Sequence, residues 1–133
     1  MEPYRVRDIA LAERGRVSIE WAESRMPVLM NLRQRFTIER SLAEIQVGAC
    51  LHVTKETAVL VETMIIGGAK VALCGSNPLS TQDDVAAALA RNGVNVFAWK
   101  GQSSTEYYEC IRSVLAYKPQ ITLDDGADLV STI

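Results

Sequence analysis

The chain has 133 residues, the usual length of one domain, and it can bury a sizeable core. Its composition, 48% hydrophobic and 23% charged, is ordinary for a folded soluble protein. The formal net charge is -2 and no block of basic residues occurs, so we expect neither a nucleic-acid nor a membrane-surface partner.

Cysteines and the N-terminus bear on the cellular compartment. Cys50 and Cys74 lie in apolar, strand-like runs, which predicts reduced core residues of an intracellular protein, and neither they nor Cys110 form a C-x-x-C pair. The first residues, MEPYR, are too polar for a signal peptide. Glu62 interrupts the longest apolar stretch, 58–66, so we expect no membrane span and a cytoplasmic location.

Two helices are expected first. Residues from about 11 to 25 carry scattered apolar positions, and Pro27 suits the first turn of a second helix. In that helix Leu29, Leu32 and Phe36 form one apolar stripe. The polar stretch 37–44 is the only candidate linker.

From residue 45 onward, strands and helices alternate. Apolar runs of strand length occur at 45–52, 70–74, 94–99 and 121–125. Helical stripes separate them: Ala58, Val61 and Ile65; Val85, Ala88 and Leu89; Tyr108, Ile111 and Leu115. This order predicts βαβ units and a mainly parallel sheet, a Rossmann-like three-layer α/β domain preceded by two helices.

Helix boundary signals agree with this division. Ser103 and Glu106 have the spacing of a capping box, Gly93 suits a helix C-terminus, and Pro119 follows the end of the last helix. Ser80 and Asp83 have the spacing of a further capping pair.

Polar residues follow each predicted strand. In an open parallel sheet, ligands bind in the crevice beyond the carboxyl ends of the strands. The four segments at those ends are 52–54 (HVT), 75–77 (GSN), 100–102 (KGQ) and 124–126 (DDG). Each contains side chains that can donate, accept or exchange protons, so we expect a small-molecule site at this edge.

His52 is the only histidine of the chain. It can be a histidine satisfied by a backbone carbonyl or, given its place at a strand end, a functional group. Thr54 is a candidate N-cap for the next helix, with Glu56 in its first turn. These cap roles do not exclude ligand contact, because a helix N-terminus in the crevice is itself a recognition surface.

Asp124 and Asp125 indicate a functional site more strongly than His52 does. Two adjacent carboxylates at the end of a buried strand can have a raised pKa and exchange protons near neutral pH. They can also belong to a turn, since Asp-Gly pairs initiate turns. With Asp128 they could bind a metal, but no spacing here is diagnostic and we expect no metal. No P-loop, G-x-G-x-x-G, H-E-x-x-H or G-x-S-x-G motif occurs.

Four ordered segments carry a family resemblance that covers nearly the whole chain. They are 49–60 (ACLHVTKETAVL), 76–83 (SNPLSTQD), 98–101 (AWKG) and 123–126 (LDDG), and residues 4–9 and 26–27 also fit. Together they resemble S-adenosyl-L-homocysteine hydrolase. Two differences are visible: Asp84 stands where animal members have histidine, and Ala127 replaces a glycine.

The resemblance implies an enzyme of one-carbon metabolism and the methionine cycle. Members of this family reversibly hydrolyse S-adenosylhomocysteine to adenosine and homocysteine with tightly bound NAD, and the full-length members form homo-oligomers. The cofactor carries the redox chemistry, while the protein supplies orientation and proton transfer.

The resemblance also implies roles for individual residues. His52 and Asp125 would be the acid/base residues around C4' and C5' of the ribose. Thr54 and Glu56 would bind the adenine edge, and Leu51 would pack against the ring. Asn77 and Asp128 would lie toward the homocysteine end.

By this resemblance, residues 1–133 correspond to the N-terminal lobe of the substrate-binding domain. The family's NAD-binding domain and its glycine-rich fingerprint are absent from this sequence, so we expect no NAD to bind these 133 residues alone and no turnover by them. The alternatives are a stand-alone, non-catalytic nucleoside-binding domain and a subunit-interaction domain.

Overall fold

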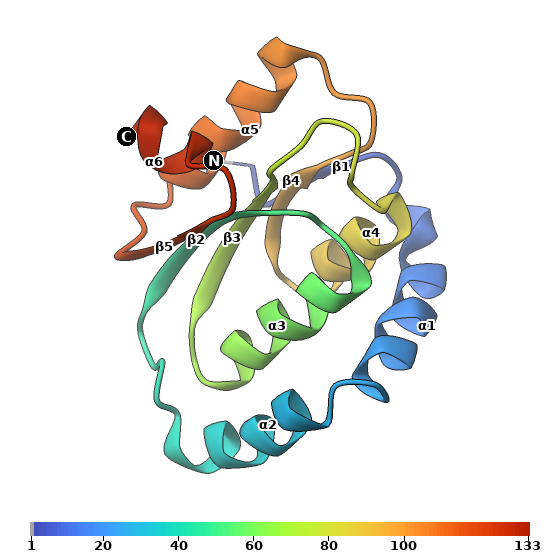
Figure 1. Cartoon of the computed structure of the whole chain (residues 1–133), viewed down its shortest axis with the longest axis vertical. Coiled ribbons are helices and arrows are strands. Elements are labelled where there is room, and N and C mark those ends of the chain that lie inside the picture. The colour runs from blue at the N-terminus through green and yellow to red at the C-terminus, as the bar shows by residue number, and fades with distance from the viewer. Residues whose placement is uncertain (1) are drawn as a thin grey trace.

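Apolar runs of the sequence become the parallel strands of one sheet. The computed structural model describes residues 2–133, and Figure 1 shows helices on both faces of the sheet. The strands are β1 (Arg5–Val6), β2 (Gln46–Leu51), β3 (Lys70–Gly75), β4 (Asn95–Ala98) and β5 (Ile121–Asp124), in the spatial order β1-β4-β3-β2-β5. The four predicted strands are confirmed to within one residue at each end. The fold is the expected Rossmann-like α/β arrangement.

Strand β1 was not predicted from the sequence. It is two residues long, and its partners are on β4, where Arg5 aligns with Phe97 and Val6 with Ala98. Two residues cannot display a period-2 pattern, so a strand this short is recognised only from the partner that it pairs with.

The helices form layers on the two faces of the sheet. They are η1 (Ile9–Leu11), α1 (Ala12–Glu23), α2 (Pro27–Glu39), α3 (Lys55–Ile66), α4 (Asp83–Arg91), α5 (Ser104–Leu115) and α6 (Asp128–Thr132). Helices α3 and α4 cover one face and α5 and α6 the other (Figure 1). Helix α1 packs on α3 and α4 from outside, and α2 packs on α3, as expected for two helices that precede the three layers.

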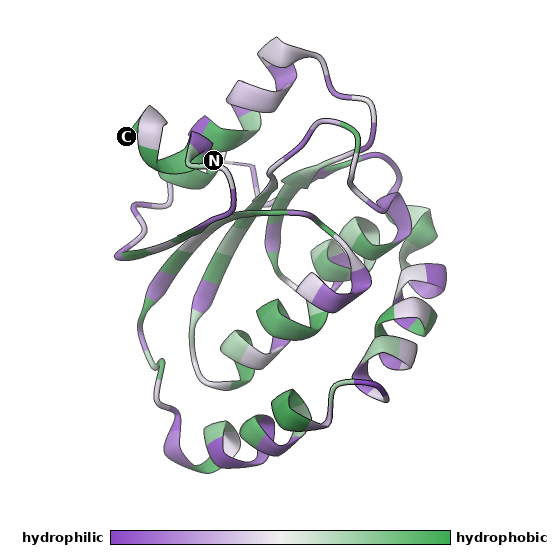
Figure 2. Cartoon of the chain, viewed as in Figure 1, coloured by the Kyte–Doolittle hydropathy of each residue, from purple (hydrophilic) through white to green (hydrophobic). Residues whose placement is uncertain are grey.

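The strands carry apolar side chains on both faces because both faces are covered. In β3, Val71 and Leu73 face the core on the α3 side, while Ala72 and Cys74 face the core on the α5 side. The same alternation separates Ala49 from Cys50 in β2. Figure 2 shows the hydrophobic colour concentrated on the strands and on α3, with polar residues along the outer helices.

Most of the predicted helix boundaries are confirmed. Ser103 and Glu106 make both hydrogen bonds of a capping box, and Gly93 takes a φ of 90° just beyond α4. The stretch 37–44 is only partly a linker, because α2 continues to Glu39 and residues 40–44 turn into β2. In the stripe predicted on α5, Ile111 is buried and Leu115 packs against the core, but Tyr108 is exposed and its neighbour Tyr107 is buried instead.

Glu62, the charge inside the longest apolar stretch, has partners across the helix layer. Both carboxylate oxygens accept hydrogen bonds from the Arg16 guanidinium of α1, the shortest at 2.8 Å, and Asn92 Nδ2 donates to Oε2 at 2.9 Å. Because a buried charge is tolerated when it is paired and hydrogen-bonded, Glu62 joins α1 and α3 without an unpaired carboxylate in the core.

All three cysteines are buried and unpaired, as predicted for Cys50 and Cys74. Within residues 2–133, no helix is both long and apolar enough to cross a membrane.

Gly15 lets α1 approach α4 closely, and this contact gives a test of the fold. A Cβ at position 15 would lie 1.8 Å from the Asp84 carbonyl oxygen, which is backbone and cannot move alone. We expect Gly15→Ala to lower the free energy of unfolding by roughly 1–3 kcal/mol, the range for overpacked cores, against alanine's better helix propensity. Chemical denaturation measures this difference.

The matched control is Gly126→Ala. Nothing in residues 2–133 lies within 4 Å of a Cβ placed there, so its unfolding free energy should stay within about 0.5 kcal/mol of wild type. An equal loss in both variants would contradict the close α1–α4 contact.

Candidate functional site

The four polar segments predicted to follow the strands lie at one edge of the sheet. All strands are parallel, so their carboxyl ends point the same way. Helices α3 and α4 carry the chain from β2 to β3 and β4, and α5 then returns it to β5 on the opposite side of β2. The direction of winding therefore reverses between β2 and β5, which is where a crevice opens in such sheets.

His52 comes directly after β2, and its side chain is exposed. Its Nδ1 lies 2.7 Å from the hydroxyl oxygen of Ser80, in the connection between β3 and α4. The partner of the histidine is thus a side chain, and the backbone-carbonyl alternative does not apply to Nδ1.

Ser80 and Asp83 do not form the predicted capping pair. Helix α4 begins at Asp83, and its N-cap is Gln82, so the Ser80 hydroxyl lies outside the first turn. Asp83 Oδ1 instead accepts a hydrogen bond of 3.0 Å from the backbone N–H of Lys100. The spacing alone did not reveal that the helix starts later than Ser80.

The N-terminus of α3 presents Thr54 and Glu56 at the same edge. Thr54 is the N-cap as predicted, and its hydroxyl accepts from the Thr57 N–H at 3.5 Å. Desolvation acts to raise the pKa of the exposed Glu56 carboxyl. The hydrogen bond from its own backbone N–H and the Lys55 ammonium, 3.3 Å away, outweigh it and lower that pKa below its usual value. Glu56 is therefore an ionised hydrogen-bond acceptor at neutral pH.

The two adjacent aspartates, Asp124 and Asp125, have different environments in the structure. Asp124 is half-buried at the end of β5, and its Oδ2 accepts a hydrogen bond of 2.9 Å from the Val130 N–H in the first turn of α6. Asp125 has an exposed side chain, while its backbone N–H donates to the Cys50 carbonyl at 3.1 Å. Asp124 thus holds α6, and Asp125 lies beside the end of β2, facing solvent.

Asp128 and Asn77 each accept a hydrogen bond from another residue of the chain. Asp128 Oδ2 accepts a hydrogen bond of 2.7 Å from the Tyr107 hydroxyl, whose pKa is raised by burial and by this bond, so the hydroxyl stays a donor. Asn77 Oδ1 accepts from the Leu79 N–H at 2.8 Å and shapes the connection after β3. Leu51, the last residue of β2, is half-buried at the same edge.

Ala127 has a left-handed backbone, with a φ of 65°. Only glycine adopts this region without a steric cost. A glycine at this position in the resembling family is therefore explained by the turn between β5 and α6, and alanine here keeps the same turn.

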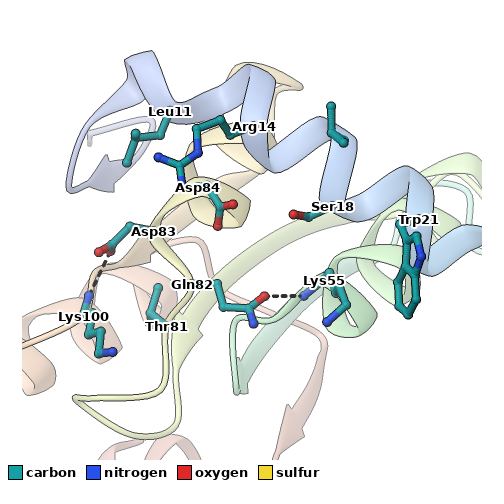
Figure 3. A pocket seen from close by; sticks show the side chains of 11 residues that line it. Leu11, Arg14, Ser18, Trp21, Lys55, Thr81, Gln82, Asp83, Asp84 and Lys100 are labelled. Atoms are coloured by element: carbon teal, nitrogen blue, oxygen red, sulfur yellow. Dashed lines mark hydrogen bonds between the residues drawn. The ribbon is translucent and has the colours of Figure 1, made fainter.

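A cavity of about 640 Å³ lies beside these residues, and none of the residues assigned to catalysis or substrate binding lines it. It is a groove between α1 and the N-termini of α3 and α4 (Figure 3). Its walls are formed by Leu11, Arg14, Val17, Ser18, Trp21, Lys55, Thr81, Gln82, Asp83, Asp84 and Lys100. The sequence analysis had singled out Asp83, Asp84 and Lys100, but for other reasons. It overlooked the helical spacing of Arg14, Ser18 and Trp21, which form the α1 wall.

Gln102 does not face the crevice as its segment suggested. It is buried, and its amide nitrogen donates to the Cys110 sulfur at 3.3 Å. Among the described residues, no group of three or more His, Cys, Asp or Glu side chains is placed to hold a metal ion.

Comparison with known proteins finds one family across the chain. The family model of S-adenosyl-L-homocysteine hydrolase matches residues 3–133. Adenosylhomocysteinase of Sulfolobus acidocaldarius is 61% identical over 126 residues, 95% of this chain and 30% of that protein. Adenosylhomocysteinase of Pyrobaculum aerophilum is 57% identical over 133 residues, which are 100% of this chain and 30% of that protein.

A relative with a different printed activity is also similar. S-inosyl-L-homocysteine hydrolase of Methanopyrus kandleri is 53% identical over 130 residues, 98% of this chain and 31% of that protein. The chain thus spans about 30% of the length of the curated relatives that it matches.

The different environments of Asp124 and Asp125 can be tested by substitution. Asp124→Ala should lower the free energy of unfolding by about 1 kcal/mol, because it removes the acceptor that caps α6. Asp125→Ala should leave it within about 0.5 kcal/mol of wild type, since that side chain is exposed. Urea unfolding measures both free energies, provided that the m-values of the variants match that of the wild type. An equal loss of stability in the two variants would contradict the different environments of Asp124 and Asp125.

Proposed function

The chain belongs to the S-adenosyl-L-homocysteine hydrolase family, and from that premise we propose that its 133 residues form the adenosine-binding lobe of an adenosylhomocysteinase. The reaction is the reversible hydrolysis of S-adenosyl-L-homocysteine to adenosine and L-homocysteine. The observation that carries the proposal is that His52 follows β2 and Asp125 follows β5. These are the two neighbouring strands between which the winding of the sheet reverses.

In this proposal His52 and Asp125 exchange protons with the substrate around C4' and C5' of the ribose. Both side chains are exposed at the edge of the sheet, and both belong to residue types that exchange protons in enzymes. The pairing of β2 with β5 brings their ends together: Cys50 aligns with Asp124, and the Asp125 N–H donates to the Cys50 carbonyl, so Asp125 lies one position out of register with His52 at the ends of neighbouring strands.

The adenine edge is assigned to Thr54 and Glu56, with Leu51 against the ring. Because Glu56 is ionised, it can only accept hydrogen bonds, and the 6-amino group of adenine is a donor. The hypoxanthine of an inosyl substrate has a carbonyl there, which would face the carboxylate without a proton between them. This favours an adenosyl over an inosyl substrate, although relatives of both printed activities are similar to the chain.

The homocysteine end is assigned to Asn77 and Asp128. Each already holds a hydrogen bond within the chain, Asn77 to Leu79 and Asp128 to Tyr107. Carboxylate and amide oxygens have further lone pairs, so these bonds leave room for a ligand contact.

NAD does not fit the residues present here. A dinucleotide fold needs a glycine-rich turn between its first strand and helix, so that the backbone can approach the pyrophosphate. The turn from β2 to α3 is His52-Val53-Thr54 and has no glycine. In this proposal NAD is held by other parts of the full-length enzymes of the family. Those enzymes are homo-oligomers and act in the cytoplasm.

The proposal predicts a base preference that depends on Glu56. Titration calorimetry should give tighter binding of adenosine than of inosine to the chain. Glu56→Gln should weaken adenosine about tenfold, the equivalent of one hydrogen bond to a charged group, and should reduce the preference. Glu39→Gln, an exposed glutamate of α2, is the matched control. Equal affinities for the two nucleosides, or an unchanged affinity in Glu56→Gln, would contradict the assignment.

Turnover is a separate test. Supplied with NAD and S-adenosylhomocysteine, the 133-residue chain should release no homocysteine above background, because the hydride acceptor has no site on it. Chromatographic measurement of free homocysteine decides this, and sustained release would refute it. The proposal therefore predicts that the 133-residue chain binds adenosine but releases no homocysteine.

A further inference from the structure

We propose that Ser80 is a positioning residue that holds the His52 ring by its Nδ1–H and so leaves the lone pair on Nε2 free in the crevice. The inference rests on the proposed function, in which His52 exchanges protons with a substrate. It concerns a residue whose sequence context predicted only a helix cap, and whose hydroxyl is instead directed at the histidine.

The connection between β3 and α4 holds Ser80 in place. On its N-terminal side, the Leu79 N–H donates to Asn77 Oδ1 at 2.8 Å. On its C-terminal side, the Gln82 N–H donates to the Val53 carbonyl at 2.9 Å. The second bond joins the connection to the residue that follows His52. The hydroxyl and the imidazole therefore belong to two segments that are tied together.

The two contacts of the Ser80 hydroxyl are compatible with a proton arrangement that leaves Nε2 bare. A hydroxyl has one proton and two lone pairs. In the proposal the Ser80 hydroxyl donates to the Asn77 carbonyl, 3.5 Å away, and its oxygen accepts from His52 at 2.7 Å. The resulting chain runs from Nδ1–H to the hydroxyl and on to the carbonyl. It assigns the proton of the neutral ring to Nδ1 and the lone pair to Nε2.

The opposite direction would not serve a proton-exchanging histidine. When Nε2 accepts a proton, the ring becomes an imidazolium, and both nitrogens are donors. An oxygen that already accepts from Nδ1–H suits the neutral and the charged ring alike. A hydroxyl proton directed at Nδ1 would have to turn away first. Ser80 thus acts as the orienting partner in a hydroxyl–histidine pair, the part that a carboxylate takes in a hydrolytic triad.

Nε2 is available for this chemistry. Within residues 2–133, the only hydrogen bond of the His52 ring is the one at Nδ1. The residue is exposed at the edge where β2 and β5 end, so a ligand can approach the ring from solvent.

The test uses the single histidine of the chain. In a long-range ¹H–¹⁵N spectrum of the ¹⁵N-labelled chain, recorded at alkaline pH where imidazole is neutral, only His52 contributes. We expect the proton on Nδ1 and the bare nitrogen at Nε2. Ser80→Ala should change the ratio of the two tautomers about 2- to 10-fold toward Nε2–H, the effect of one net hydrogen bond. Ser80→Thr, which keeps the hydroxyl, should restore the wild-type ratio.

Controls separate this effect from a general disturbance. Ser113→Ala removes a serine hydroxyl on α5 that bonds the Glu109 carbonyl, and it should leave the ring signals unchanged. A wild-type proton on Nε2, or an unchanged ratio in folded Ser80→Ala, would overturn the proposal. If Ser80→Ala fails to fold, the wild-type tautomer and Ser80→Thr decide. Since no substrate is present, these outcomes are independent of the adenosine titration that tests the proposed function.

Discussion

Strand β2 is hydrogen-bonded on both sides, and the arrangement of the site depends on this pairing. Its residues align with β3 on one edge and β5 on the other, so that Cys50 faces both Cys74 and Asp124. Its central residues are buried in the core clusters on both faces of the sheet, and its carboxyl end leads into the candidate site. His52, Thr54 and Glu56 leave the strand in that direction, because polar side chains at a buried strand can be satisfied only where the sheet stops.

Polar residues at this edge divide into two kinds. Asn77, Asp83 and Asp124 accept backbone N–H groups and fix the connections between strands and helices. His52, Glu56 and Asp125 face solvent above those connections. A rigid support beneath exposed groups is what an orienting site requires, since ligand groups must be held within a fraction of an ångström. The groove along α1 adjoins this surface and shares Asp83 with the edge, but His52, Glu56 and Asp125 do not line it.

Much of the fold could be predicted from the sequence because local patterns control it. Long apolar runs gave β2 to β5 to within one residue, and the Ser103–Glu106 box marked the start of α5. The failures are places where a distant partner controls the local structure. β1 exists only by pairing with β4, and Tyr107 rather than Tyr108 is buried because Asp128 and the sheet lie on its side of α5. Ser80 fits a cap by spacing, but the helix begins at Asp83.

By itself the sequence determined the kind of fold, the family and the residues at the strand ends, because periodicity, turn chemistry and ordered motifs are all local properties. Only the tertiary structure decided which partner and which degree of exposure each of those residues has. Strand pairing and helix packing give the Asp124 carboxylate a backbone partner in α6 and leave the Asp125 side chain exposed, although the two are adjacent in the chain. The same packing brings Ser80 to His52 across 28 residues of sequence, a contact that no spacing rule contains.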